Sequence, residues 1–253
     1  MTTRVWQWDN GVCGVSGEPW TGVRYFCTWR AGGVSAAPWD SLNLGLHVDD
    51  DPEAVARNRA RLSAGLPAEP LWLDQVHGTA VYEAALPVAA APCADAAVTT
   101  QRGRPLAIMT ADCLPVILAD DAGTVLGAAH AGWRGLLAGV LENTLRAMRR
   151  QTPHARGWRA WIGPGIGPTA FEVGDEVRAA FVRQAPLADC FVPGTRPGHW
   201  LADLPGLAAW RLARAGVGRV EASGECTYTR ADRYFSYRRQ VRTGRQASVA
   251  WLV

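Results

Sequence analysis

Short, almost wholly apolar runs recur along the chain between polar and glycine-rich segments. Apolar runs of this kind, bounded by turn residues, are typical of strands that are buried on both faces. The pattern predicts strands at residues 71–76, 81–84, 106–110, 115–118, 125–129, 160–162, 234–237 and 247–253. A loop that carries His77 and Gly78 separates the first two of these strands.

Longer stretches predict helices at residues 52–65, 136–150, 174–184 and 204–215. For the first, Asp50 or Asp51 can serve as the N-cap. Pro52 suits the first turn of that helix, and Gly65 closes it. Gly216 closes the last helix in the same way.

The predicted strands and helices mix without strict alternation. We therefore expect an α/β (α+β) layered sandwich with mixed sheets rather than a barrel or a doubly wound nucleotide fold. No internal repeat or low-complexity linker divides the chain, and the Ala- and Pro-rich residues 87–96 suggest a connection rather than a boundary. Residues 1–253 are thus expected to form a single domain.

Composition narrows the chemistry. Of the 253 residues 48% are hydrophobic and 19% charged, which supports a full core and excludes a largely disordered chain. All 26 basic residues are arginines, so Schiff-base chemistry, a pyridoxal-phosphate anchor and a Walker A lysine are excluded. An anionic substrate must be held by arginine, backbone N–H groups or a metal. The net charge of +3 is small and the arginines are scattered along the chain, so we expect no nucleic-acid surface.

Location follows from what the sequence lacks. The first ten residues do not resemble a signal segment, and no apolar run is long enough to cross a membrane. The six cysteines are far apart, with no C-x-x-C pair, so disulfides are not expected. We expect a reduced, cytoplasmic protein that is a monomer or a small homo-oligomer and has no membrane partner.

Three polar residues interrupt apolar or glycine-rich surroundings where predicted strands end or are interrupted: His77, Cys113 and His130. Two imidazoles and a thiolate form a suitable ligand set for Zn²⁺, with a fourth position left for water. Asp112, beside the thiolate, could orient a ligand or carry a proton. From the pattern alone, a buried cysteine, two loop histidines and a turn-capping aspartate remain an open alternative.

Common catalytic motifs are absent, including G-x-S-x-G, H-E-x-x-H and the paired cysteines of zinc deaminases. Instead, the chain resembles the YfiH-like, laccase-domain family, also called multicopper polyphenol oxidase or purine nucleoside phosphorylase-like. The matching blocks run over nearly the whole chain: SLNLGLHV at 41–48, NR at 58–59, QVHG at 75–78, TADCLPV at 110–116, HAGWRG at 130–135, IGP at 162–164, FEVG at 171–174, FSYRR at 235–239 and TGRQ at 243–246. Two departures, Asp49 in place of a common glycine and no cysteine after Pro164, leave the three ligand positions untouched.

The resemblance implies one zinc ion at His77, Cys113 and His130, and a fold similar to that of bacterial-toxin cysteine hydrolases. It also implies phosphorolysis of adenosine, inosine and 5′-methylthioadenosine, together with deamination of adenosine. Small purine nucleosides and phosphate would then be the partners. The catalytic residues would be the three ligands and Asp112. The substrate-binding residues that we expect are Asn43, Arg59, Gln75, Trp133, Arg134, Glu172 and Arg238.

Three alternatives from other classes remain. Copper-dependent oxidation of phenols would suit a His₂Cys site, but five histidines are too few for a mononuclear site plus a trinuclear cluster. A cysteine hydrolase that edits cell-wall precursors would use Cys113 as its nucleophile and a histidine as its base. A pure binding module would have the pocket without turnover.

Overall fold

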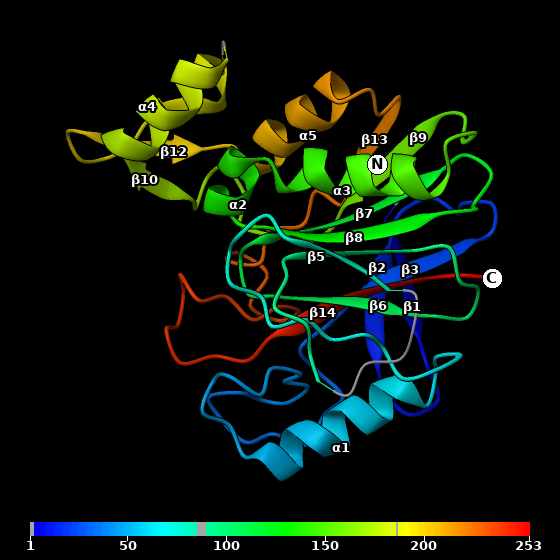
Figure 1. Ribbon diagram of the computed structural model, residues 1–253. Helices are drawn as coiled ribbons and strands as arrows, with labels where there is room; N and C mark the ends of the chain where they lie inside the picture. The colour runs from blue at the N-terminus through cyan, green and yellow to red at the C-terminus, as the bar shows by residue number, and fades with distance from the viewer. Residues whose placement is uncertain (1–2, 85–89, 186) are drawn as a thin grey trace.

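Two large sheets lie face to face in this computed structural model, which describes residues 3–84, 90–185 and 187–253. The five-stranded sheet has the order β1-β2-β3-β14-β6, and all of its pairs are antiparallel (Figure 1). Its strands are β1 (Arg4–Gln7), β2 (Cys13–Ser16), β3 (Val23–Thr28), β14 (Gln246–Leu252) and β6 (Leu106–Thr110).

The six-stranded sheet has the order β13-β9-β7-β8-β5-β4. The outer pairs β13–β9 and β4–β5 are parallel, whereas the central pairs are antiparallel, so this sheet is mixed. Its strands are β13 (Arg219–Ala222), β9 (Trp158–Ile162), β7 (Leu114–Asp120), β8 (Leu126–Ala131), β5 (Ala96–Thr99) and β4 (Val81–Glu83).

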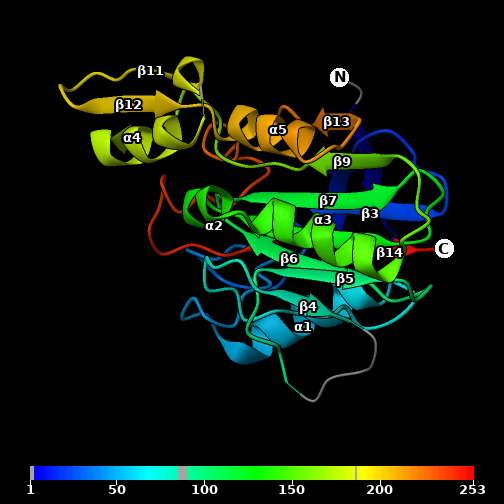
Figure 2. The same ribbon diagram turned by 45° about the horizontal axis from the view of Figure 1, so that its top comes forward.

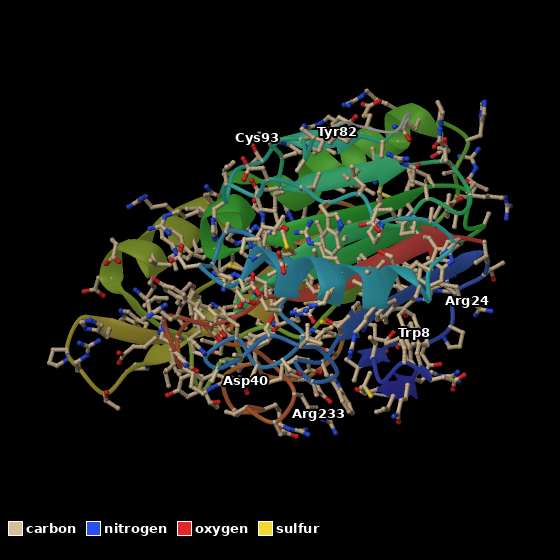
Figure 3. The ribbon with its side chains drawn as sticks, turned by 90° about the horizontal axis from the view of Figure 1, so that it is seen from below. Trp8, Arg24, Asp40, Tyr82, Cys93 and Arg233 are labelled. Carbon is tan, nitrogen blue, oxygen red and sulfur yellow. The ribbon has the colours of Figure 1, made fainter. Side chains whose placement is uncertain are left out.

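Helices cover the outer faces of the two sheets, which gives four layers (Figures 1 and 2). The upper layer holds α2 (Trp133–Ala138), α3 (Val140–Gln151) and α5 (Leu204–Arg214), and α1 (Pro52–Ser63) forms the lower one. A smaller unit projects to one side and contains β10 (Glu172–Gly174), α4 (Asp175–Gln184), a 3₁₀ turn (Ala188–Cys190), β11 (Phe191–Pro193) and β12 (His199–Ala202). Seen from below, α1 crosses the five-stranded sheet (Figure 3).

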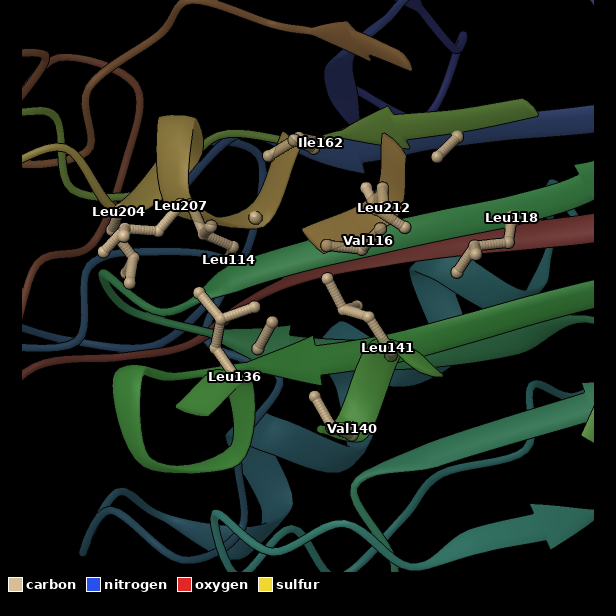
Figure 4. Packing of buried hydrophobic residues seen from close by; sticks show 14 of the residues in the cluster. Leu114, Val116, Leu118, Leu136, Val140, Leu141, Ile162, Leu204, Leu207 and Leu212 are labelled. Carbon is tan, nitrogen blue, oxygen red and sulfur yellow. The ribbon is translucent and has the colours of Figure 1, made fainter. Parts of the chain in front are cut away.

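The alternation of side chains along β7 explains why its sequence is apolar from Leu114 to Ala119. Leu114, Val116 and Leu118 pack against the upper helices (Figure 4), while Ile117 and Ala119 face the five-stranded sheet. Both faces of this strand are therefore buried, as its continuous apolar run predicts. A third cluster fills the space between the five-stranded sheet and α1.

The structure confirms a mixed α/β fold with mixed sheets, and most of the predicted elements. Three predictions were wrong. Residues 136–150 are not one helix, because Gly139, with φ of 97°, separates α2 from α3. Residues 71–76 form only isolated bridges, and residues 234–237 form no strand. The predicted connection at 87–96 falls partly outside the described residues, and its last residue begins β5.

None of the described helices is both long enough and apolar enough to span a membrane. At one end of the six-stranded sheet, β7 and β8 lie beside the start of α2 and the turn that follows β6. The predicted ligands lie at this end of the six-stranded sheet.

Candidate metal centre

His77, Cys113 and His130 lie together although long stretches of chain separate them. Their ligand atoms all fall within 4.8 Å of one another. Cys113 Sγ is 3.8 Å from His77 Nε2, and the two imidazole rings are 4.8 Å apart at an angle of 72°. His130 projects from β8 and is 4% exposed, Cys113 directly precedes β7, and His77 is on an exposed loop. The structure thus brings together the three predicted side chains.

Sharp backbone turns present two of the three ligands. His77 itself has φ of 60°, and Asp112, just before Cys113, has φ of 98°. A non-glycine residue in the left-handed region costs about 1–3 kcal/mol and persists only where its surroundings hold it. The Asp112 carboxylate accepts hydrogen bonds from Thr227 Oγ1 and from the backbone N–H of Arg238, both at 2.7 Å. Asp112 therefore ties the turn that carries Cys113 to the C-terminal segment.

Charge favours a thiolate at this position. Burial would raise the pKa of Cys113, but His130 and His77 outweigh burial and lower it to about 6. Burial would lower the pKa of His130, but Cys113 and the buried Asp95 raise it to about 9. The thiolate is the form of cysteine that binds metals and acts as a nucleophile.

The donor set fits a bound transition metal. Two imidazole nitrogens and one thiolate sulfur are ligands that metals such as zinc and copper accept. Within the described ranges, no other group of three or more His, Cys, Asp and Glu side chains is close enough to hold a metal ion.

The three ligands line a cavity of about 530 Å³, which is a typical size for a small-molecule site. Five of the other expected site residues also line it: Gln75, Asp112, Trp133, Arg134 and Arg238. Sequence reasoning did not assign the remaining lining residues to the site: His47, Met109, Thr110, Ala111, Ile166, Phe171, Tyr237 and Arg245. His47, Tyr237 and Arg245 lie inside the family motif blocks, and this position is the sequence feature that could have indicated them as site residues.

Arg59 is not among the lining residues of this cavity. Its Nε donates a hydrogen bond of 2.9 Å to the carbonyl of Leu44, and its guanidinium lies 4.1 Å from the centre of the Trp72 ring. Arg59 therefore joins α1 to neighbouring loops, and the arginines that face the cavity are Arg134, Arg238 and Arg245.

Asn43 and Glu172 also lie outside the lining. The Asn43 side chain accepts hydrogen bonds from the backbone N–H groups of Gly45 and Arg245, so it shapes the wall without facing the cavity. The Glu172 carboxylate forms an ion pair of 2.7 Å with Arg196. The Asn43 contacts therefore support the cavity wall, whereas the Glu172 ion pair lies outside the lining.

Gln75 faces the cavity but is tied to a strand. Its amide donates to the Met109 carbonyl and accepts from the Met109 N–H, each at 2.8 Å. The side-chain amide therefore pairs with the backbone of β6 as a neighbouring strand residue would, and this pairing fixes the chain just before His77.

The layered fold and the cluster at the end of its sheet define a mixed α/β protein with a candidate metal site. The chain belongs to the family described as multi-copper polyphenol oxidoreductase laccase, whose model matches residues 24–253. The predicted family resemblance is therefore confirmed.

Named relatives are closely similar. A Pseudomonas aeruginosa protein named purine nucleoside phosphorylase is 51% identical over 231 residues, which cover 91% of this chain and 93% of that protein. Escherichia coli purine nucleoside phosphorylase YfiH is 47% identical over 92% of this chain and 95% of its own.

Solved structures show the same fold. A Neisseria meningitidis protein has a TM-score of 0.87 at 45% identity and covers 95% of this chain and 98% of its own. YlmD from Geobacillus stearothermophilus has a TM-score of 0.88 at 30% identity and covers 99% of both chains.

Proposed function

We propose that this protein is a zinc-dependent purine nucleoside enzyme that carries out phosphorolysis of adenosine, inosine and 5′-methylthioadenosine, and deamination of adenosine. The observation that carries the proposal is the His77, Cys113 and His130 cluster in a cavity that arginines also line. The names of the relatives support the phosphorylase activity. Deamination and the choice of nucleosides rest on the family resemblance.

Zinc is the favoured metal because one N₂S group suits a single catalytic zinc with an open position. A multicopper centre needs further histidine clusters. His154 lines a different cavity and His199 lies on β12, so neither adds to the cluster. Bound at this group, zinc would supply a Lewis acid that polarises a substrate group or makes a water molecule more acidic.

Phosphorolysis needs a held phosphate. In this reaction a phosphate oxygen attacks C1′ of the ribose, the bond from C1′ to the base breaks, and the base leaves with the electron pair and takes up a proton. Arg238 is our proposed clamp, because its Nη1 donates to the Glu172 carbonyl at 2.9 Å and its guanidinium lies 5.4 Å from the centre of the Phe171 ring. These contacts hold a cation at the cavity wall, where it can pair with phosphate.

Arg134 and Arg245 are the further candidates for contact with phosphate or ribose, since both line the cavity. The Arg134 guanidinium lies 4.4 Å from the centre of the Trp133 ring, so Trp133 can hold the arginine or stack on the base.

Deamination needs proton transfer near C6 of the purine as water adds and ammonia leaves. Asp112 is our proposed proton carrier because it lines the cavity and directly precedes the candidate ligand Cys113. Each of its oxygens accepts one hydrogen bond and keeps a second lone pair for a proton. Glu172 is less suited, since Arg196 holds its carboxylate outside the lining.

The test combines elemental analysis with product analysis. Protein purified without added metal should contain about one zinc ion per chain, and it should convert adenosine to adenine plus ribose 1-phosphate when phosphate is present, and to inosine plus ammonia. His77→Ala should lose zinc and both activities, whereas His154→Ala, changed in a separate cavity, should keep them. Full phosphorolysis by zinc-free protein would refute the shared site.

A cysteine hydrolase is the second candidate, and one observation favours it. His130 Nδ1 lies 2.9 Å from Asp95 Oδ1, and with Cys113 these residues form a Cys–His–Asp arrangement. This second proposal also includes the expected similarity to the fold of bacterial-toxin cysteine hydrolases. Hydrolysis of cell-wall precursor fragments by metal-free protein, lost in Cys113→Ala but kept in His77→Ala, would place this activity first.

We also propose that residues 1–253 act as one unit, because the cavity is lined by side chains from His47 to Arg245.

A further inference from the structure

One fully buried carboxylate contacts the segments that carry two of the three metal-site residues. Asp95 is 0% exposed and lies directly before β5. Its Oδ1 accepts hydrogen bonds from His77 N–H at 2.8 Å and is 2.9 Å from His130 Nδ1. Its Oδ2 accepts from the N–H groups of Gly78 at 2.6 Å and Val76 at 3.2 Å.

The backbone of Asp95 adds to this arrangement. Its carbonyl accepts a hydrogen bond of 2.7 Å from the backbone N–H of His130, so His130 contacts this residue through both its backbone and its ring. Three successive N–H groups, from Val76 to Gly78, converge on the carboxylate around the left-handed turn at His77. The strained turn is held in place by these contacts.

The carboxylate also determines where the His130 ring carries its proton. Three backbone N–H groups already donate to the two oxygens of Asp95, which is the arrangement expected of an ionised carboxylate. An ionised carboxylate only accepts hydrogen bonds, so Nδ1 of His130 must carry a hydrogen. Nε2 is then free of hydrogen in the neutral ring and available to a metal.

We propose that Asp95 is the positioning residue of the metal site, which fixes the Nδ1–H tautomer of His130 and the loop conformation of His77. The inference rests on the proposed function in that it takes the cluster to be a metal site. A histidine ligand whose other ring nitrogen donates to a carboxylate is more basic and better oriented, and loss of such a partner commonly costs 10–100-fold in metal affinity.

Asp95→Asn is the informative variant. An asparagine keeps the size of the side chain but replaces one acceptor oxygen with an NH₂ donor. Whichever way the amide turns, the NH₂ group faces either His77 and His130 or Val76 and Gly78. One pair of contacts is therefore lost and replaced by donor facing donor.

Asp120 provides a matched control. It is 2% exposed, and its carboxylate accepts the N–H of Thr124 at 2.6 Å, the hydroxyl of Thr124 at 2.7 Å and the N–H of Val125 at 3.1 Å. It is a buried, loop-holding carboxylate on β7, in the same sheet, but it has no histidine partner. Asp120→Asn should destabilise the fold in a similar way without a direct effect on the metal site.

The experiment measures zinc affinity by chelator competition in the full-length wild type and in both variants. Asp95→Asn should bind zinc about 10–100-fold more weakly, and Asp120→Asn should stay within about twofold of the wild type even where its Tm falls. With Co²⁺ in place of zinc, the visible absorption of Asp95→Asn should change. Wild-type affinity and an unchanged cobalt spectrum in Asp95→Asn would overturn the proposal.

A second measurement separates this inference from the metal assignment. Nitrogen-15 NMR of the metal-free protein, recorded above pH 9 so that the His130 ring is neutral, should show the hydrogen of His130 on Nδ1 in the wild type and a shifted tautomer population in Asp95→Asn. A wild type that binds no zinc would refute the proposed function while the NMR result still decides the role of Asp95. An Nε2–H tautomer in the wild type would overturn the inference whatever metal binds.

Discussion

Gly132 offers a direct test of the geometry of the metal site. It precedes α2 with φ of −67°, a value that any residue can adopt, so alanine introduces no backbone strain there. A Cβ at this position would lie 2.8 Å from Cys113 Sγ and 3.0 Å from His77 Cδ2. Gly132→Ala therefore places a methyl group against two of the three ligands.

The size of the effect follows from these distances. Restoring an ordinary contact of 3.4 Å requires the sulfur and the methyl group to separate by about 0.6 Å. Metal–ligand distances tolerate deviations of only about 0.2 Å. If the sulfur moves, Cys113 leaves its ligand position, so we expect zinc affinity to fall by at least about 10-fold, comparable with loss of a ligand-orienting group.

The assay is chelator competition for zinc, with circular dichroism to confirm folding. Gly78→Ala is the control, because it changes the residue next to His77 but its Cβ would lie 3.4 Å from Asp95 Oδ2 and 3.7 Å from Val76 Cγ2. The control should bind zinc as the wild type does. A folded Gly132→Ala protein with wild-type zinc affinity would show that metal binding does not use these ligand positions.

Three further predictions concern Arg238, Asp112 and Cys27. Arg238→Gln should raise the KM for phosphate about 10-fold or more in steady-state kinetics, whereas Arg59→Gln should lower Tm and leave that KM unchanged. Asp112→Asn should lower kcat for deamination by about 10²-fold or more if its carboxylate carries the proton, with zinc content unchanged by elemental analysis; an unaltered kcat would assign the residue to support alone. Burial raises the pKa of the Cys27 thiol to about 12, so above pH 9 the unfolded chain loses this proton first, and the free energy of unfolding should fall by up to about 1.4 kcal/mol per pH unit. The free energy of unfolding can be measured by urea titration at several pH values from 9 to 10. Its decrease per pH unit should be smaller in Cys27→Ala than in the wild type, and unchanged in the exposed Cys93→Ala.

The sequence predicted best the uniformly buried strands and the helix with a periodic buried face. β7 is apolar from Leu114 to Ala119 because both of its faces are covered, and β6 and the amphipathic helix α5 were placed within a residue of their bounds. The strands β1, β2 and β3 were not predicted, since glycine and polar residues interrupt their apolar positions. The break between α2 and α3 was missed because an isolated glycine is tolerated within a helical pattern.

The candidate site was predictable only in part. Polar residues stand out where apolar strands end, and this pointed to the three side chains that lie together at the candidate metal site and to Asp112 beside them. Asp95 gave no such signal, because an aspartate in an alanine-rich stretch resembles any turn residue until the fold brings it against His77 and His130. Arg59 lies outside the cavity lining for a related reason, since helix α1 directs it toward Trp72 and its motif does not reveal the direction.

The geometry also bears on the choice between a metal site and a cysteine hydrolase. A Cys–His–Asp arrangement needs only Cys113, His130 and Asp95. In such an enzyme the His77 side chain would have no chemical role. Yet His77 is held 3.8 Å from the sulfur in a left-handed conformation that costs about 1–3 kcal/mol. The carboxylate that orients His130 also stabilises this strained turn. A strained residue supported in this way is explained by a third metal ligand, and so the position of His77 favours the metal site.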